Sequence, residues 1–215
     1  VDYHPDSDTG KMNRESCQTP GAGDQKLNTY RIHTYGCQMN ERDSENLAGL
    51  LDGAGYRKSA PDEEPDIIVF NTCCVRENAE RKIFGKINEY KALRTRRKDV
   101  ILAIVGCLPQ QPGASERIMR LLPHVNVILG THNVHRLMDA IEVASTIERP
   151  FVEVWEREAD IIEGAPSTRA PGLTAWVTVT YGCNNFCSYC IVPYVRGRER
   201  SRRPQDIVSE VRTLV

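Results

Sequence analysis

Six cysteines fall into two triplets whose composition could support metal chemistry. One triplet is spread along the chain and consists of Cys37, Cys73 and Cys107. The other is compact, follows the pattern C-x3-C-x2-C and consists of Cys183, Cys187 and Cys190. Thiolate ligands favour zinc, Cu(I) or iron–sulfur clusters, so each triplet is a candidate metal centre.

The number of ligands favours iron–sulfur clusters over structural zinc. A structural zinc ion binds four protein ligands, commonly two C-x2-C pairs or cysteines with added histidines. Only Cys187 and Cys190 form a C-x2-C pair, although His132 and His135, three residues apart on a predicted helix, could complete a zinc site. Two [4Fe–4S] clusters fit better, because each would keep one iron without a protein ligand and open for chemistry.

Some cysteines need not bind metal at all. The spread triplet, taken alone, could consist of buried structural cysteines, because a free cysteine packs like a small hydrophobic residue. Cys74 adjoins Cys73 and is either a bystander, which we expect, or a substitute ligand. Cys17 lies in the polar stretch of residues 1–27, which we predict to be a disordered tail, and we interpret this cysteine as incidental.

Alternating apolar and amphipathic segments predict the elements that position the spread triplet. Short runs rich in Val, Ile and Leu predict strands at residues 29–35, 65–71, 99–106 and 125–130. Amphipathic segments predict helices at residues 41–56, 76–96, 114–123 and 133–144. This alternation is typical of an α/β fold, here a doubly wound parallel sheet over residues 28–145.

Each cysteine of the spread triplet follows a predicted strand. Cys37 comes after the first strand, Cys73 after the second and Cys107 after the third. The loops at the carboxyl ends of parallel strands line one crevice, in which ligands bind. We therefore expect the three cysteines, about 35 residues apart in the sequence, to converge in space.

The compact triplet belongs to a second region. Residues 146–172 are charged and interrupted by Pro and Gly, which predicts a linker with one strand at residues 151–155. Residues 173–181 alternate like a strand, and a helix begins near Pro204. Because these few elements cannot bury their own apolar faces, residues 173–215 are expected to be the start of an incomplete second domain.

Composition limits where the protein works and what it contacts. Eight cysteines without a secretory signal favour a reducing compartment, the cytoplasm, and no apolar run approaches the ~20 residues that cross a membrane.

With a net charge of -1, any nucleic-acid contact must come from local patches. Residues 94–98 (RTRRK) form one patch, which we interpret as a solvated helix end. A second patch, suited to phosphate, carboxylate or cofactor contacts, comprises Arg196, Arg198, Arg200, Arg202 and Arg203.

Several motifs resemble a known family. The pattern C-x3-C-x2-C, with an aromatic residue before its last cysteine, resembles the cluster motif of radical S-adenosylmethionine (SAM) enzymes. The segments TYGCQMNERDSE, NTCCVRENAE, VGCLPQQ and ILGTHNVHRL resemble the amino-terminal domain of the methylthiotransferases. Within that family, YGCQMN favours the MiaB branch, which acts on transfer RNA, over the RimO branch, which acts on a ribosomal protein. One departure is Cys74, where the family usually carries a small residue other than cysteine.

The resemblance implies an enzyme with two [4Fe–4S] clusters and SAM. It assigns Cys183, Cys187 and Cys190 to the cluster that binds SAM and cleaves it to a radical. It assigns Cys37, Cys73 and Cys107 to an auxiliary cluster that presents the inserted sulfur. The implied reaction is methylthiolation at C2 of N6-isopentenyladenosine beside the anticodon. An electron donor such as flavodoxin or ferredoxin is implied, and we expect a monomer.

Other readings remain open. Tyr189 precedes Cys190 and either contacts the adenine of SAM or packs in a core. Asn71 and Thr72 either shape the auxiliary loop or are ordinary loop residues. The substrate could instead be threonylcarbamoyl-adenosine in tRNA or a ribosomal protein, and the cysteines could serve a non-catalytic zinc or RNA-binding module. Because the family's barrel and its RNA-binding TRAM domain continue beyond this sequence, we expect this chain alone to be inactive.

Overall fold

A computed structural model describes residues 28–74, 77–158, 160–169 and 172–214 of the 215-residue chain. The predicted amino-terminal tail and Cys17 lie outside the described residues.

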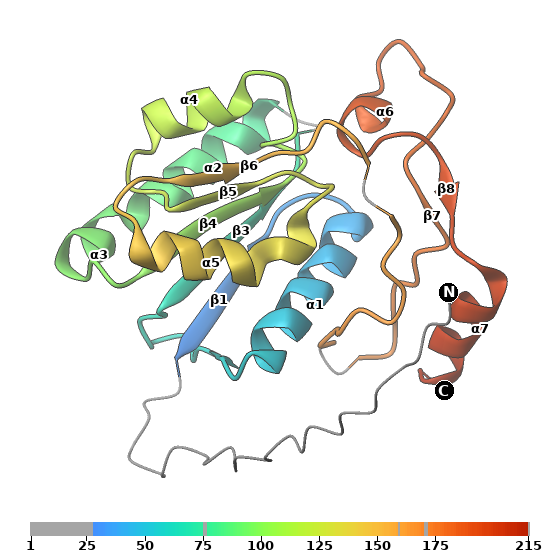
Figure 1. The fold of residues 1–215 in the computed structure, drawn as a ribbon, viewed down its shortest axis with the longest axis horizontal. Helices are drawn as coiled ribbons and strands as arrows, with labels where there is room; N and C mark the ends of the chain where they lie inside the picture. Colours follow the sequence, from blue (N-terminus) through green and yellow to red (C-terminus); the bar gives the residue numbers. More distant parts are fainter. Residues whose placement is uncertain (1–27, 75–76, 159, 170–171, 215) are drawn as a thin grey trace, which may run out of the picture.

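Six parallel strands form one sheet with the spatial order β2-β1-β3-β4-β5-β6 (Figure 1). The strands are β1 (Thr29–Thr34), β2 (Arg57–Lys58), β3 (Ile67–Thr72), β4 (Ile101–Gly106), β5 (Val127–Leu129) and β6 (Phe151–Glu153). All six residues of β3 and of β4 are buried. This burial is expected, because the continuous Val and Ile runs of a central parallel strand are covered on both faces.

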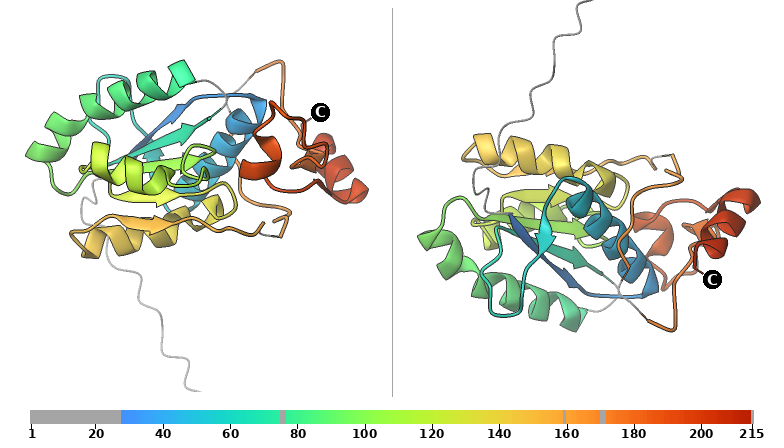
Figure 2. Two further views of the ribbon diagram at one scale, coloured as in Figure 1. Left: turned by 90° about the horizontal axis from the view of Figure 1, so that it is seen from above. Right: turned by 90° about the horizontal axis from the view of Figure 1, so that it is seen from below.

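Helices cover both faces of the sheet, as predicted (Figure 2). One face packs against α1 (Gln38–Gly53) and α5 (Leu137–Thr146), which is preceded by the 3-10 turn η1 (Val134–Arg136). The other face packs against α2 (Glu77–Glu89), α3 (Lys91–Arg96) and α4 (Ala114–Leu121). The α/β fold with a doubly wound parallel sheet is thereby confirmed.

Three details differ from the predicted elements. The short edge strand β2 was not predicted, because its two exposed residues carry no apolar pattern. The single helix predicted at residues 76–96 is divided at Tyr90 into α2 and α3. The strand predicted at residues 151–155 is present as β6, but it pairs with β5, so the sheet continues beyond residue 145 into the predicted linker.

The segment after the sheet contains little regular structure. Its elements are β7 (Thr180–Tyr181), α6 (Val192–Val195), β8 (Arg200–Ser201) and α7 (Pro204–Arg212). The strand predicted at residues 173–181 is reduced to β7, because its antiparallel partner β8 offers only two residues for pairing. Leu173, Trp176 and Val179 are exposed, so the start of a barrel is not visible in this segment.

A network of ion pairs joins this segment to helix α1. Glu210 of α7 binds Arg42 of α1 at 2.9 Å, Arg169 at 2.5 Å and Arg202 at 2.6 Å. Arg169 also binds Glu45 of α1 at 2.8 Å. These five side chains are 8–20% exposed, so solvent screens the network only partly. Figures 1 and 2 show the segment beyond the end of the sheet where α1 begins.

Candidate functional site

The strand order reverses beside the first two cysteines of the spread triplet. From β1 the chain passes through α1 to β2 on one side, and it then returns to β3 on the other side. Ligands of doubly wound sheets bind at such a switch point, outside the carboxyl ends of the strands. Cys37 lies just beyond β1 and Cys73 just beyond β3. The structure therefore places these two residues beyond the carboxyl ends of the two strands that flank the switch point.

Cys37 occupies the amino-terminal cap of helix α1. Its carbonyl oxygen accepts hydrogen bonds from the backbone N–H groups of Asn40, at 2.9 Å, and Glu41, at 3.2 Å. Its Sγ contacts Asn40 Oδ1 at 3.4 Å. A helix amino terminus favours negative charge, so this position suits a thiolate or an anionic cluster. Cys37 is exposed, whereas Cys73 and Cys107 are 7% and 4% exposed.

A buried pair of asparagines fixes the three loops relative to one another. Asn71 Nδ2 donates to the carbonyl oxygen of Asn40 at 2.7 Å and to Ser44 Oγ at 2.9 Å. Asn40 Nδ2 donates in turn to Asn71 Oδ1 at 3.0 Å and to the carbonyl oxygen of Thr72 at 3.1 Å. The same Thr72 oxygen accepts the backbone N–H of Cys107 at 2.9 Å. Asn71 and Thr72 thus connect the loops that carry the spread triplet.

The sequence analysis missed Asn40, the partner of Asn71. Asn40 is fully buried on the first turn of α1. The only signal was its place three residues after Cys37, within the segment YGCQMN. A polar residue at that spacing is common at helix starts, so the role of Asn40 became apparent only from its contact with Asn71 of β3.

Two glycines allow the loops to approach closely. Gly36 precedes Cys37 with φ +137°, and a Cβ built on it would lie 2.7 Å from both Cys73 Cβ and Asn40 Oδ1. Gly106 precedes Cys107 with φ +100°, and its Cβ would lie 2.7 Å from Asn71 Oδ1. Side chains rarely adopt these backbone angles. The cysteines can therefore converge here only because glycine stands before two of them.

Cys74 interacts with Cys107 as well as adjoining Cys73. The two thiols share a hydrogen bond, which raises the pKa of Cys107 and lowers the pKa of Cys74. Burial raises the pKa of Cys107 further. Cys73, Cys74 and Cys107 therefore all lie at the carboxyl edge of β3 and β4.

The compact triplet lies in a loop closed by the β7–β8 ladder, which pairs Thr180 with Ser201 and Tyr181 with Arg200. The backbone N–H of Cys183 donates to the carbonyl oxygen of Gly197 at 3.1 Å. The N–H of Cys190 donates to the carbonyl oxygen of Cys187 at 2.9 Å and forms a turn. Cys187 is exposed, and the other two cysteines are partly exposed. The loop therefore holds its thiols near solvent.

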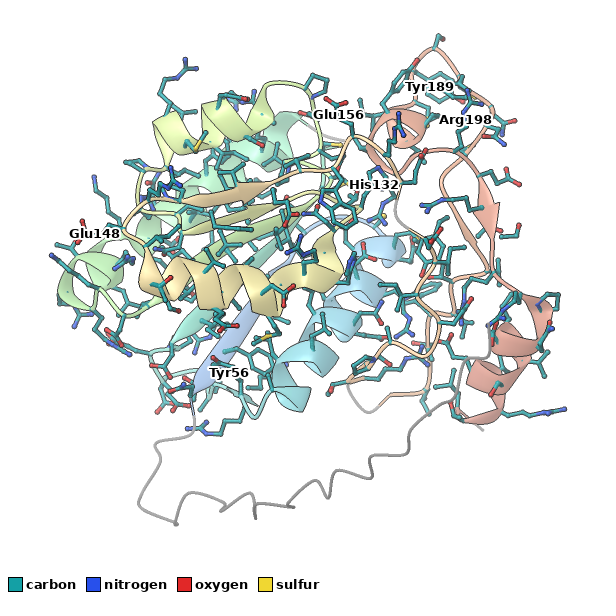
Figure 3. The ribbon with its side chains drawn as sticks, in the orientation of Figure 1. Tyr56, His132, Glu148, Glu156, Tyr189 and Arg198 are labelled. Carbon is teal, nitrogen blue, oxygen red and sulfur yellow. The ribbon has the colours of Figure 1, made fainter. Side chains whose placement is uncertain are left out.

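Aromatic side chains of this loop are mostly exposed. Tyr189 is 90% exposed and lies at the outer end of the molecule, as does Arg198 (Figure 3). The described residues therefore provide no core around Tyr189. The guanidinium of Arg198 lies 5.4 Å from the ring centroid of Phe186, which in turn contacts Tyr194 edge to face at 5.9 Å. A cation over an aromatic ring stabilises such an exposed loop modestly.

The arginines after the compact triplet mainly form ion pairs within the protein. Arg196 binds Asp43 of α1 at 2.7 Å, and Arg202 binds Glu163 at 2.7 Å. Arg203 pairs with Asp206 on its own helix. The patch at residues 94–98 lies elsewhere, because its Arg97 binds Asp66, which precedes β3 at the amino end of the sheet.

The geometry does not provide a ready-made site for a single ion. Among the described residues, no three His, Cys, Asp or Glu side chains are positioned to hold one metal ion. His132 and His135 instead line a cavity of about 360 Å³ together with Asp43, Tyr181 and Arg200. His132 lies between the sheet and the carboxyl-terminal segment (Figure 3). Burial lowers the pKa of both histidines.

The donor set is compatible with a four-iron cluster. Each thiolate of such a cluster binds a different iron atom, so the ligands stand farther apart than around one ion. All donors of the spread triplet are thiols, and one of them, Cys37, caps the amino terminus of α1. An anionic iron–sulfur cluster is suited by these thiolates, by the positive end of the α1 dipole and by the close approach of the loop backbones.

Comparisons with known proteins agree with this geometry. Residues 29–130 match the family described as "Uncharacterized protein family UPF0004". The chain is 52% identical over 184 residues to a protein of Clostridium novyi (strain NT) named tRNA-2-methylthio-N(6)-dimethylallyladenosine synthase, which covers 86% of this chain. Proteins with the same name from Moorella thermoacetica (strain ATCC 39073 / JCM 9320) and Bacillus cereus (strain AH187) are 51% and 46% identical, over 87% and 86% of this chain.

The matched region is only part of each relative. The chain covers 41%, 42% and 36% of the lengths of these three proteins, in the order given above. Among the described residues, no helix is long and apolar enough to cross a membrane.

Proposed function

Because residues 29–130 of this chain belong to the UPF0004 family and most of the chain is 46–52% identical to tRNA-2-methylthio-N(6)-dimethylallyladenosine synthases, we propose that it acts in tRNA methylthiolation. The observation that supports this proposal is that Cys37, Cys73 and Cys107 each follow the carboxyl end of one of three neighbouring strands, β1, β3 and β4. The compact triplet lies in a separate loop that is bound to the same helix, α1.

Each triplet would hold one [4Fe–4S] cluster. Cys37, Cys73 and Cys107 would bind the auxiliary cluster, with Asn71 keeping their three loops in register. Cys183, Cys187 and Cys190 would bind the second cluster in the loop closed by β7 and β8. When bound, the compact-triplet cluster would supply the electron that cleaves SAM to a radical, and the auxiliary cluster would present the sulfur that is inserted into the substrate.

The chain's own residues would hold the clusters and orient SAM and the sulfur. Three thiolates per cluster leave one coordination position free, which at the compact triplet would receive SAM and at the spread triplet an exogenous sulfur. Tyr189 lies beside Cys190 at the exposed face of the loop, where its ring can stack on the adenine of SAM. The ion pairs of Arg42 and Arg196 with residues of the other region keep the two cluster loops at a fixed relative position.

The proposed substrate is the N6-isopentenyladenosine beside the tRNA anticodon, methylthiolated at C2. The electron donor would be a flavodoxin or a ferredoxin, the site of action the cytoplasm and the working form a monomer. A methylthiotransferase acting on threonylcarbamoyl-adenosine or a ribosomal protein is the alternative within the same enzyme class. Nucleoside analysis of tRNA from cells lacking the gene distinguishes them, and an unchanged level of 2-methylthio-isopentenyladenosine refutes the proposed substrate.

Metal analysis tests the ligand assignment. Protein reconstituted without oxygen should bind about eight iron atoms per chain, four for each cluster. Replacing either triplet with alanine should halve the iron and leave a single Mössbauer-active [4Fe–4S] cluster. Cys17→Ala, outside both triplets, is the matched control and should keep all the iron. Colourless protein containing one zinc ion instead would favour the non-catalytic zinc or RNA-binding module.

The neighbouring thiols of the spread triplet can be separated in the same experiment. Cys73→Ala should lose the auxiliary cluster, and Cys74→Ala should keep it. The reverse result would move the ligand assignment to Cys74, which shares a hydrogen bond with Cys107.

A further inference from the structure

Arg196 carries a positive charge from the compact-triplet region into the neighbourhood of the spread triplet. It follows helix α6, six residues after Cys190. Its guanidinium Nη2 donates to Asp43 Oδ2 at 2.7 Å, and its side chain is only 10% exposed. Asp43 lies on α1, the helix whose amino-terminal cap is Cys37. The arginine is therefore held at the end of the molecule where the three loops meet.

Neighbouring contacts fix the backbone at this position. The carbonyl oxygen of Val195 accepts a hydrogen bond from Thr131 Oγ1, in the loop after β5. Thr131 in turn donates its backbone N–H to Gln110 Oε1 at 2.9 Å, in the loop that begins with Cys107. The segment at Val195 and Arg196 is thus connected both to α1 and to the loops after β4 and β5.

The electrostatic surroundings of Arg196 include two proposed ligands. Burial alone would lower the pKa of Arg196, but the charges of Asp43, Cys107 and Cys37 raise it well above its usual value. The position of the guanidinium is set by its hydrogen bond to Asp43, which lies six residues after Cys37 on α1.

The other arginines of this region are less suited to a ligand at the crevice. Arg202 binds two carboxylates, those of Glu163 and Glu210, and Arg42 binds Glu45 and Glu210. Arg198 lies over Phe186 at the outer end of the loop. Within the described part of the chain, the Arg196 side chain makes one hydrogen bond, although a guanidinium has five N–H donors.

We propose that Arg196 binds and orients an anionic sulfur species at the iron of the auxiliary cluster that no cysteine ligates. The proposal rests on the proposed function, because it presupposes a cluster on Cys37, Cys73 and Cys107. Hydrosulfide and alkyl thiolates are anions, and a desolvated guanidinium stabilises an anion through charge-assisted hydrogen bonds. Asp43 restrains the arginine and, by its own negative charge, weakens the attraction for the ligand. Arg196 thus acts as a binding residue rather than a metal ligand.

The test measures binding of sodium sulfide rather than turnover. The compact triplet is first replaced with alanine, so that the auxiliary cluster is the only one present. Sulfide is then titrated into reconstituted protein without oxygen, and binding is followed by the electron paramagnetic resonance of the reduced cluster. Arg196→Gln should weaken sulfide binding roughly 10- to 100-fold, as for one lost hydrogen bond to a charged group. Arg196→Lys, which keeps the charge, should recover part of this loss.

Asp43→Asn separates this role from a purely structural one. It breaks the same ion pair but leaves the positive charge at the crevice, so sulfide should bind more tightly than in the parent protein. If the ion pair only attaches the two regions, Arg196→Gln and Asp43→Asn should have the same effect, which would overturn the proposal. If Arg196→Gln loses its cluster, Asp43→Asn decides alone, and unchanged or weaker binding overturns the proposal.

The same experiment separates the two levels of inference. If the parent protein assembles no four-iron cluster on the spread triplet, the proposed function fails. If it assembles the cluster but binds sulfide equally well with and without Arg196, only the role of Arg196 is refuted.

Discussion

Replacing Asn71 with alanine should reveal how strongly the cysteine loops depend on one amide. The side chain is 1% exposed, so water cannot take over its contacts. The change removes two donated hydrogen bonds, to Asn40 and Ser44, and one accepted from Asn40. At about 1 kcal/mol net for each bond, the free energy of unfolding should fall by about 3 kcal/mol. Asn40 keeps its bond to Thr72, which limits the loss.

The assay is urea unfolding of the metal-free chain under reducing conditions, followed by circular dichroism. With a slope of about 2 kcal/mol per molar urea, the midpoint should fall by about 1.5 M. Asn88→Ala is the matched control, because Asn88 is an exposed residue in the helix α2. Alanine favours helices, so the control should change stability by less than about 1 kcal/mol and towards greater stability. A loss at Asn71 no larger than at Asn88 would refute the role of the amide pair.

Three further outcomes follow from particular contacts. Gly36→Ala should destabilise the chain by about 2 kcal/mol or more, because its φ is +137° and the added Cβ would lie 2.7 Å from that of Cys73; thermal unfolding measures this. Asp66→Asn should flatten the loss of stability in acid. Burial raises the pKa of Asp66, but hydrogen bonds from Arg97 and Thr29 lower it overall. The contribution of Asp66 to the free energy of unfolding is therefore present above about pH 4 and is lost as the pH falls through the lowered pKa. Unfolding measured from pH 7 to pH 2 shows this loss. Arg202→Gln should expose the carboxyl-terminal segment to limited proteolysis several-fold faster while leaving the sheet intact, because it leaves two carboxylates without this partner.

Each of these outcomes has a control within the chain. Gly85→Ala, with no atom within 4 Å of the new Cβ on helix α2, should be neutral or stabilising, and an equal loss at both glycines would contradict the steric argument. If the free energy of unfolding of Asp66→Asn varied with pH as that of the parent does, the lowered pKa of Asp66 in the folded state would be excluded. Arg203→Gln, an exposed arginine that pairs only along its own helix, should leave proteolysis unchanged.

The sequence predicted the sheet because its buried strands depend on local patterns. The runs at Ile67–Thr72 and Ile101–Gly106 contain enough Val and Ile to identify buried strands. The rule that loops after parallel strands share one edge then brings Cys37, Cys73 and Cys107 together without coordinates. By contrast, β2 was missed, because two exposed residues carry no periodicity and are recruited only by the edge of β1.

The strand expected at residues 173–181 shows the limit of reading alternation alone. Its apolar and polar residues alternate, yet only Thr180 and Tyr181 pair, because a strand exists only where a neighbour offers backbone groups. The arginines after the compact triplet show the same limit. Their sequence suggested contacts with phosphate or cofactor, whereas Arg196 and Arg202 bind carboxylates that stand up to 153 residues away.

The sequence alone therefore determined the fold class, the two cysteine triplets and the edge at which the first one gathers. These features follow from residue type and short-range spacing, which act within one strand, helix or turn. Only the tertiary structure decided that Asn40 meets Asn71, that Cys74 faces Cys107 and that Arg196 reaches Asp43. These are contacts between residues separated by 31, 33 and 153 positions, respectively, and many partners are chemically equivalent until packing selects one of them.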